Sequence, residues 1–232
     1  MQIYGPKAGL ERFRREAVHC QAMCEAIAAE PDEPKAAEFA ALATHAQGRI
    51  DTIDARMGDL RRAGDILTRA AALERVRKIR TKEAYEQLRR DLAAEAAATF
   101  RTLLPTAPNT IGKAGIKRAL GLVEGAVANL RGPDFPESVR TEHLPILERQ
   151  FQRMREADLA EDQSAASLSA LRAGIILFKA NQQRERESAY GRLVELVGKV
   201  GAEEFFLPLY TRKKGSAGSE DVEDDEDLDD VG

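Results

Sequence analysis

The stretch Pro31-Asp32-Glu33-Pro34 occurs a second time in this chain, as Pro133-Asp134-Phe135-Pro136. Further matches stand around each copy in the same order. Lys7-Ala8-Gly9-Leu10 recurs as Lys113-Ala114-Gly115-Ile116, Ala84-Tyr85 as Ala189-Tyr190, and Leu103-Leu104-Pro105 as Phe206-Leu207-Pro208. Six of the nine prolines thereby fall into three related pairs. The pattern predicts a tandem duplication, with a first helical repeat over residues 1–108 and a second over residues 109–214.

Before each proline pair, apolar residues recur every three or four positions, which is typical of an amphipathic helix. In the first copy the stripe consists of Leu10, Phe13, Ala17, Cys20, Cys24 and Ile27; in the second it consists of Ile116, Leu120, Val123, Val127 and Leu130. Cys20 and Cys24 therefore occupy the positions of Val123 and Val127. We expect both thiols to pack in a core rather than to bind a metal or act as a redox pair.

The proline pairs predict turns, because proline lacks a backbone donor and disfavours helix in the residue before it. After Pro34 a helical pattern continues past Gly58 and Gly64, and the sequence leaves open whether this helix is continuous. Thr81 is a candidate cap for the segment that follows it, and Pro145 is expected to begin or kink the corresponding helix of the second copy. The run Ile175 to Phe178 is apolar on every face, which predicts the middle of the core.

Composition favours helices throughout, since aromatic residues make up only 5% of the chain and Ala, Leu, Arg and Glu dominate. We predict an all-α fold in which the duplicated units form a pseudo-symmetric helical bundle with long antiparallel helices. The repeats either share one bundle or form two adjoining bundles.

The net charge of -4 combines two opposed parts. Residues 220–230 hold nine of the 39 acidic residues and no basic one, which leaves residues 1–219 with 35 basic and 30 acidic side chains. Residues 215–232 are therefore predicted to form a disordered acidic tail. Its default role is to keep the protein soluble; folding back on the basic body and docking a basic partner are the alternatives.

The N-terminal residues lack the charged and then apolar pattern of a signal peptide, and the longest apolar run, residues 174–178, is too short to span a bilayer. The two cysteines form no disulfide framework. We expect a cytoplasmic protein without a membrane partner.

No pattern typical of catalysis or cofactor binding is found. Glu16 and His19 have the spacing of a di-iron ligand pair, but Ala119 and Leu122 stand at the corresponding positions of the second copy. Nucleophile elbows, P-loops and dinucleotide-binding fingerprints are absent. The sequence therefore predicts a protein that is not an enzyme, with no catalytic residue, no metal site and no cofactor.

The most distinctive charged stretch is a group of five cations in eight residues, which are the candidate anion-binding residues: Arg75, Arg77, Lys78, Arg80 and Lys82. The positions 105 residues later are neutral or acidic, so the group belongs to one copy only. Phosphate contacts by these cations would make binding salt-dependent. A solvated helix face, or pairing with Glu185 and Glu187, is the competing interpretation.

Three hypotheses for function follow. The first is a non-enzymatic adaptor or scaffold whose helical faces bind another protein or a second copy of this chain. The second is a polyanion- or nucleic-acid-associated protein that uses residues 75–82, with the acidic tail as an autoinhibitory or solubilising segment. The third, an enzyme or a small-ligand carrier, requires a pocket lined by convergent polar groups.

Overall fold

The computed structural model describes residues 9–95, 101, 104 and 106–207. These residues form five helices: α1 (Leu10–Ala28), α2 (Ala36–Glu95), α4 (Pro108–Lys113), α5 (Ile116–Leu130) and α6 (Glu137–Glu204). The part of the chain that is described contains no strand. The predicted all-α class is therefore confirmed.

Both proline pairs lie in turns between a short helix and a long one. Residues 29–35 separate α1 from α2, and residues 131–136 separate α5 from α6. The second proline of each pair lies within two residues of the next helix, and the carbonyl of Pro136 accepts the first helical bond from Arg140 at 3.0 Å. These turns could be predicted because proline acts on the backbone locally.

The helix after Pro34 is continuous, a point that Gly58 and Gly64 leave open in the sequence. Gly58 and Gly64 both lie inside it, and 60 residues form one continuous helix. Thr81 lies in its interior, fully buried, and its hydroxyl donates a hydrogen bond to the carbonyl of Arg77 at 2.8 Å. The prediction that Thr81 caps a helix is wrong, because its hydroxyl bonds back into the same helix.

Helix α6 differs from the sequence pattern at two places. It begins at Glu137, so Pro145 lies inside it and does not begin it. The break in helical geometry comes instead at Gly198, whose φ of 76° and ψ of 170° belong to a region open almost only to glycine.

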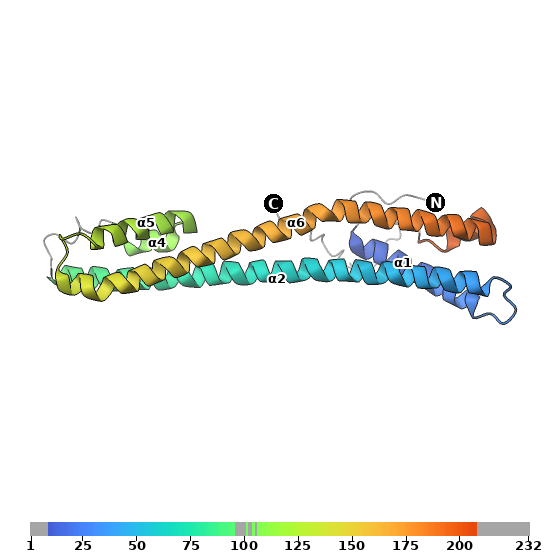
Figure 1. The fold of residues 1–232 in the computed structure, drawn as a ribbon, viewed down its shortest axis with the longest axis horizontal. Coiled ribbons are helices and arrows are strands. Elements are labelled where there is room, and N and C mark those ends of the chain that lie inside the picture. Colours follow the sequence, from blue (N-terminus) through green and yellow to red (C-terminus); the bar gives the residue numbers. More distant parts are fainter. Residues whose placement is uncertain (1–8, 96–100, 102–103, 105, 208–232) are drawn as a thin grey trace, which may run out of the picture. The chain divides into compact units, whose positions relative to one another are not determined.

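The chain divides into two compact units that do not follow the predicted repeat boundary. The first unit contains α1, residues 36–60 of α2 and residues 171–204 of α6; the second contains residues 61–95 of α2, α4, α5 and residues 137–170 of α6. In Figure 1, α1 runs beside the first part of α2, and α4 lies beside α5. Each unit draws on both predicted repeats, and the duplication itself stays a prediction.

The core of the first unit is formed by α1, the start of α2 and the end of α6. Cys20 and Cys24 are buried there, as expected from their place on the stripe. The rings of Phe39 and Phe205 stack with centroids 6.1 Å apart.

The centre of this core is not where the apolar run of α6 predicts it. Ile176 and Leu177 are 73% and 66% exposed, whereas Ile175 and Phe178 pack against a small cluster around Phe13 and Ile53. The prediction is wrong because other helices pack against only one side of α6 at residues 175–178, so Ile176 and Leu177 face solvent.

The core of the second unit is formed by α5 packed against α2 and α6. Val123, Val127 and Leu130 are buried against Leu88 and Met154. The two valines are thus buried in α5 as the two thiols are in α1.

Two further predictions concern the acidic tail and the membrane. The predicted tail, residues 215–232, lies outside the described residues. Among the residues that are described, no helix has an apolar stretch long enough to cross a membrane.

Candidate functional site

The five predicted anion-binding residues do not share one face of α2. Arg75, Lys78 and Lys82 are spaced by three and four residues and form one stripe, whereas Arg77 and Arg80 lie on another side of the helix. Arg80 pairs with Glu83 at 3.0 Å, and Lys82 pairs with Glu86 at 3.3 Å. The stretch is therefore not a single cationic patch.

The competing interpretation, pairing of this stretch with Glu185 and Glu187, stays a prediction because these glutamates belong to the other unit. Within that unit, Glu185 contacts His45 at 2.8 Å, and Glu187 accepts a hydrogen bond from Gln183 at 3.0 Å. The partners of the cations are local because acidic residues one turn away compete for them.

The stripe of Arg75, Lys78 and Lys82 adjoins the junction between α4 and α5. The Nζ of Lys78 donates a hydrogen bond to the carbonyl of Ala114 at 3.0 Å. The side chain of Lys82 lies so close to Gly112 that a Cβ there would come within 3.1 Å of its Cδ. Two segments distant in sequence thus bring their basic residues to one place in the second unit.

A shallow concavity of about 300 Å³ lies at the same junction, and Lys113 and Arg118 line it with Asn109 and Thr110. Helix α5 begins here with two cations, Lys117 and Arg118, in its first turn, and it has neither an acidic residue there nor a side-chain cap. Cations are unfavourable at the positive end of a helix dipole, whereas an anion would be stabilised. We call Lys78, Lys82, Lys113 and Arg118 the junction cations.

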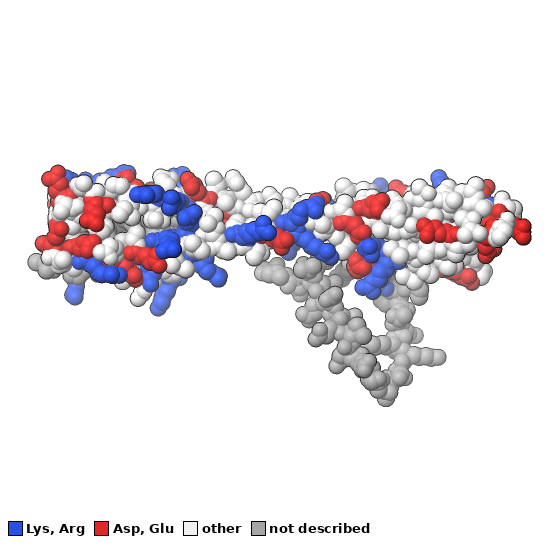
Figure 2. Space-filling model, turned by 90° about the horizontal axis from the view of Figure 1, so that it is seen from below, with Lys and Arg blue, Asp and Glu red and all other residues white. Residues whose placement is uncertain are grey.

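Acidic side chains near these cations partly neutralise their positive charge. On the face drawn in Figure 2, Lys and Arg side chains lie among Asp and Glu side chains. Lys117, next to the concavity, pairs with Asp162 at 3.4 Å. Any anion bound here would be held by a few local contacts and not by a large field of one sign.

A second surface of the same unit combines exposed apolar residues with arginines along one side of α2. Six exposed residues alternate at spacings of four and three and so form one stripe, which we call the outer stripe: Arg62, Ile66, Arg69, Leu73, Val76 and Arg80. Ile66, Leu73 and Val76 are 55%, 42% and 49% exposed. Apolar side chains alternate here with arginines along an uncovered helix face.

The first unit contains a buried charge cluster that the sequence analysis misses. Glu16 is fully buried and accepts a hydrogen bond from Nε of Arg186 at 2.6 Å. Its other oxygen lies 3.9 Å from Nη2 of Arg49, which is 4% exposed and donates from Nε to Gln182 at 3.3 Å. The guanidinium of Arg186 also lies over the ring of Phe206, 5.1 Å from its centroid.

Glu16 and His19, which have the spacing of a di-iron ligand pair, contact different partners. The Nε2 of His19 contacts the carbonyl of Glu204 at 3.0 Å and does not join the cluster. The signal that could reveal a buried Glu16 is its position three residues after Phe13, on the stripe that α1 buries.

The cluster and the thiols influence each other's protonation. The pKa of the Cys20 thiol is lowered, chiefly because Cys24 donates a hydrogen bond to it and also because Arg49 lies nearby. Burial lowers the pKa of Arg49, and the charge of Glu16 opposes that shift. Both thiols are buried, so a substrate in solution cannot reach Cys20 although its pKa is lowered.

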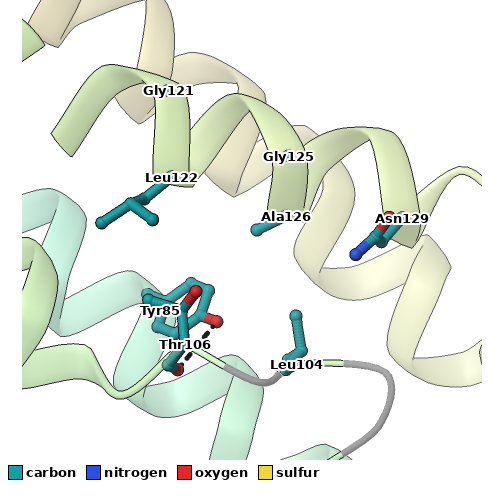
Figure 3. Close-up of a pocket in the computed structure, with 8 residues that line it drawn as sticks. All are labelled: Tyr85, Leu104, Thr106, Gly121, Leu122, Gly125, Ala126 and Asn129. Carbon is teal, nitrogen blue, oxygen red and sulfur yellow. Dashed lines mark hydrogen bonds between the residues drawn. The ribbon is translucent and has the colours of Figure 1, made fainter. Parts of the chain in front are cut away.

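A cavity of about 160 Å³ in the second unit is drawn in Figure 3. The hydroxyl of Tyr85 points toward the carbonyl of Thr106 and donates a hydrogen bond to it at 3.1 Å. Gly121, Gly125 and Ala126 form much of the opposite wall, and the side chain of Asn129 lies at its edge. These residues include no charged or nucleophilic pair, so the cavity lacks the convergent groups that the enzyme hypothesis requires.

The fold and these surfaces define the chain as an all-α protein with two compact helical units. Comparison of the sequence with protein-family models and with curated proteins finds no match, and comparison of the fold with solved structures finds none either.

Proposed function

We propose that this protein is a helical interaction protein, an adaptor or scaffold, that binds an acidic amphipathic helix along the outer stripe of α2. The observation that carries the proposal is the regular alternation of exposed apolar residues and arginines along that stripe. A helix face that bears apolar residues at this spacing normally packs against another element.

The charges on the stripe specify the partner. Arg62, Arg69 and Arg80 occupy three of its six positions. A second copy of the same stripe would place arginine near arginine, which disfavours self-association through this face. A partner helix with leucines at its centre and glutamates on its flanks would cover the apolar residues and pair with the arginines.

A labelled amphipathic peptide of about 20 residues, with leucines in a stripe and glutamates beside them, tests this proposal. We expect saturable binding by fluorescence anisotropy and no binding of a scrambled peptide of the same composition. Replacement of Leu73 and Val76 by serine should weaken binding at least tenfold, which is a loss of about 1.4 kcal/mol.

Ile176 and Leu177 provide the matched control, because they are more exposed than Leu73 and Val76 and belong to the other unit. Replacing both by serine should leave the affinity for the peptide unchanged. Equal losses in the two double variants would show nonspecific apolar contact and would count against the outer stripe.

A second candidate function, polyanion binding, is favoured by a separate observation. The junction cations come from α2, α4 and α5: Lys113 and Arg118 line the concavity, and Lys78 and Lys82 lie against the neighbouring residues Ala114 and Gly112. The surface is small and partly neutralised, so we expect weak binding that falls steeply with salt.

A labelled single-stranded oligonucleotide, titrated at several salt concentrations, tests the second candidate. Charge reversal by Lys113→Glu with Arg118→Glu should remove two phosphate contacts and reduce the slope of log K against log salt by about 1.4. The pair Arg77→Glu with Arg80→Glu, on another side of α2, should change the slope less. A larger effect of the second pair would move the site to the stretch that the sequence alone indicates.

A further inference from the structure

We propose that Asp91 of α2, together with Glu142 and His143 of α6, forms a binding site for a divalent transition-metal cation. One ligand atom from each of the three side chains lies within 4.8 Å of the other two. All three belong to the second unit, and two facing helices supply them, which is how helical bundles usually build metal sites. The site shares no residue with the outer stripe or with the junction cations.

His143 provides the evidence that a ligand is expected here. Its side chain is 4% exposed, and Nε2 lies 2.9 Å from Oδ2 of Asp91. The nitrogen is sealed from solvent, yet its approach to the carboxylate does not have hydrogen-bond geometry. A buried imidazole nitrogen without a hydrogen bond is uncommon, because burial without a partner is unfavourable. A cation held jointly by the imidazole and the carboxylate would give this nitrogen the partner that it lacks.

His45 offers a comparison within the same molecule. Its Nε2 lies 2.8 Å from Oε2 of Glu185, a similar distance, but that contact has the geometry of a hydrogen bond. The side chain of His45 is 33% exposed. His45 therefore forms an ordinary pair with one carboxylate, whereas His143 adds a second carboxylate, that of Glu142, and lacks the hydrogen bond.

The surroundings of Asp91 also suit a ligand. The side-chain amide of Gln87 donates hydrogen bonds to both oxygens of Asp91, at 3.1 and 3.0 Å. Such outer contacts orient the carboxylates that bind metals in proteins. Glu142 is exposed and can complete the site by a small rotation, since ligand atoms about 2.1 Å from a metal lie roughly 3 to 3.4 Å apart.

The chemistry of the three ligands selects the cation. One imidazole and two carboxylates suit Zn²⁺ and Mn²⁺, whereas Mg²⁺ and Ca²⁺ prefer oxygen ligands alone. Zn²⁺ should bind more tightly than Mn²⁺, in keeping with the usual order of affinities. With only three protein ligands, water would complete the coordination.

Isothermal titration of the full chain with ZnCl₂, MnCl₂ and MgCl₂ tests the proposal. We expect one Zn²⁺ per chain, weaker binding of Mn²⁺ and no comparable binding of Mg²⁺. Glu142→Gln changes an exposed residue, so the protein should stay folded, and it should weaken Zn²⁺ binding at least tenfold. Asp91→Asn and His143→Gln should weaken it further, with folding checked by circular dichroism.

Two controls separate this site from other sources of affinity. His45→Gln should leave Zn²⁺ binding unchanged, and so should the double variant Cys20→Val with Cys24→Val, which removes both thiols. The proposal is overturned if the wild-type chain binds no Zn²⁺ at a defined stoichiometry. It is equally overturned if binding survives Glu142→Gln undiminished or disappears with the thiols.

Discussion

Glu16 shows how a single charged residue fixes the packing of three helices. Its carboxylate, on α1, bonds to Arg186 of α6 and faces Arg49 of α2, all within the first unit. Removing these charges from water is costly, and only their mutual contacts offset that cost. A buried group of this kind accepts few alternative arrangements, so the cluster helps to set the register of α1 against both long helices.

Breaking this cluster should destabilise the protein strongly. Arg186→Ala leaves the buried Glu16 carboxylate without its 2.6 Å partner, and we expect a loss of about 3 to 5 kcal/mol in the free energy of unfolding. Urea titration followed by circular dichroism measures the loss. Arg14→Ala removes a pair with Asp54 of the same length but on the surface, and should cost far less. Similar losses in the two variants would contradict the importance of burial.

Glu74 should make the free energy of unfolding depend on pH. Partial burial raises the pKa of its carboxyl group, and the nearby charge of Glu161 adds to the shift. Because the pKa in the folded state exceeds that of the unfolded chain, the ionised form costs stability, and this cost disappears as the pH falls through the folded pKa. Glu74→Gln should therefore raise the melting temperature slightly at pH 7 and give no gain near pH 3. A gain of equal size at both pH values would assign the effect to packing instead.

At the level of elements, α6 depends on a glycine near its end. Gly198 has a backbone conformation that other residues adopt only with strain. Gly198→Ala should cost about 1 to 3 kcal/mol in the free energy of unfolding, as measured by thermal or urea denaturation.

Gly191 of the same helix is the matched control. It lies in regular helix, and a Cβ added there would contact no heavy atom within 4 Å. Gly191→Ala should therefore stabilise the protein by up to about 1 kcal/mol. If both alanines stabilised the protein, the helix would tolerate a regular conformation at residue 198 and the break would have no structural importance.

The elements that the sequence predicts well are those that local chemistry determines. The proline turns and the buried stripe of α1 follow from backbone restriction and helical spacing. The exposure of Ile176 and Leu177 could not be predicted, because it depends on how many other helices pack against this part of α6.

The candidate sites divide in the same way. Spacing within α2 alone would separate Arg75, Lys78 and Lys82 from the other two cations. In contrast, the approach of Gly112 and Ala114 to this stripe requires the tertiary fold, as does the meeting of Asp91 with His143. Local patterns carry no information about contacts between helices that lie far apart in the sequence.

At the scale of the whole molecule, the charge is unevenly distributed along the chain. Residues 61–170, the second compact unit, contain 19 basic and 15 acidic side chains. Residues 1–60 and 171–219 together contain 16 basic and 15 acidic side chains, so most of the basic excess belongs to the second unit. The nine acidic residues of 220–230 have the opposite charge, and we propose that they compete with an acidic ligand for these basic side chains.

If the acidic segment competes for the basic side chains, its removal should raise the affinity of the protein for an oligonucleotide. Deletion of residues 216–232 should tighten oligonucleotide binding several-fold at low salt, and the difference should shrink as added salt screens both interactions. The control keeps the length of the chain and replaces the nine acidic residues by Asn and Gln; it should match the deletion, because charge and not bulk is what competes. Binding that keeps both its affinity and its salt slope after deletion would rule out an inhibitory role and leave the segment as an aid to solubility.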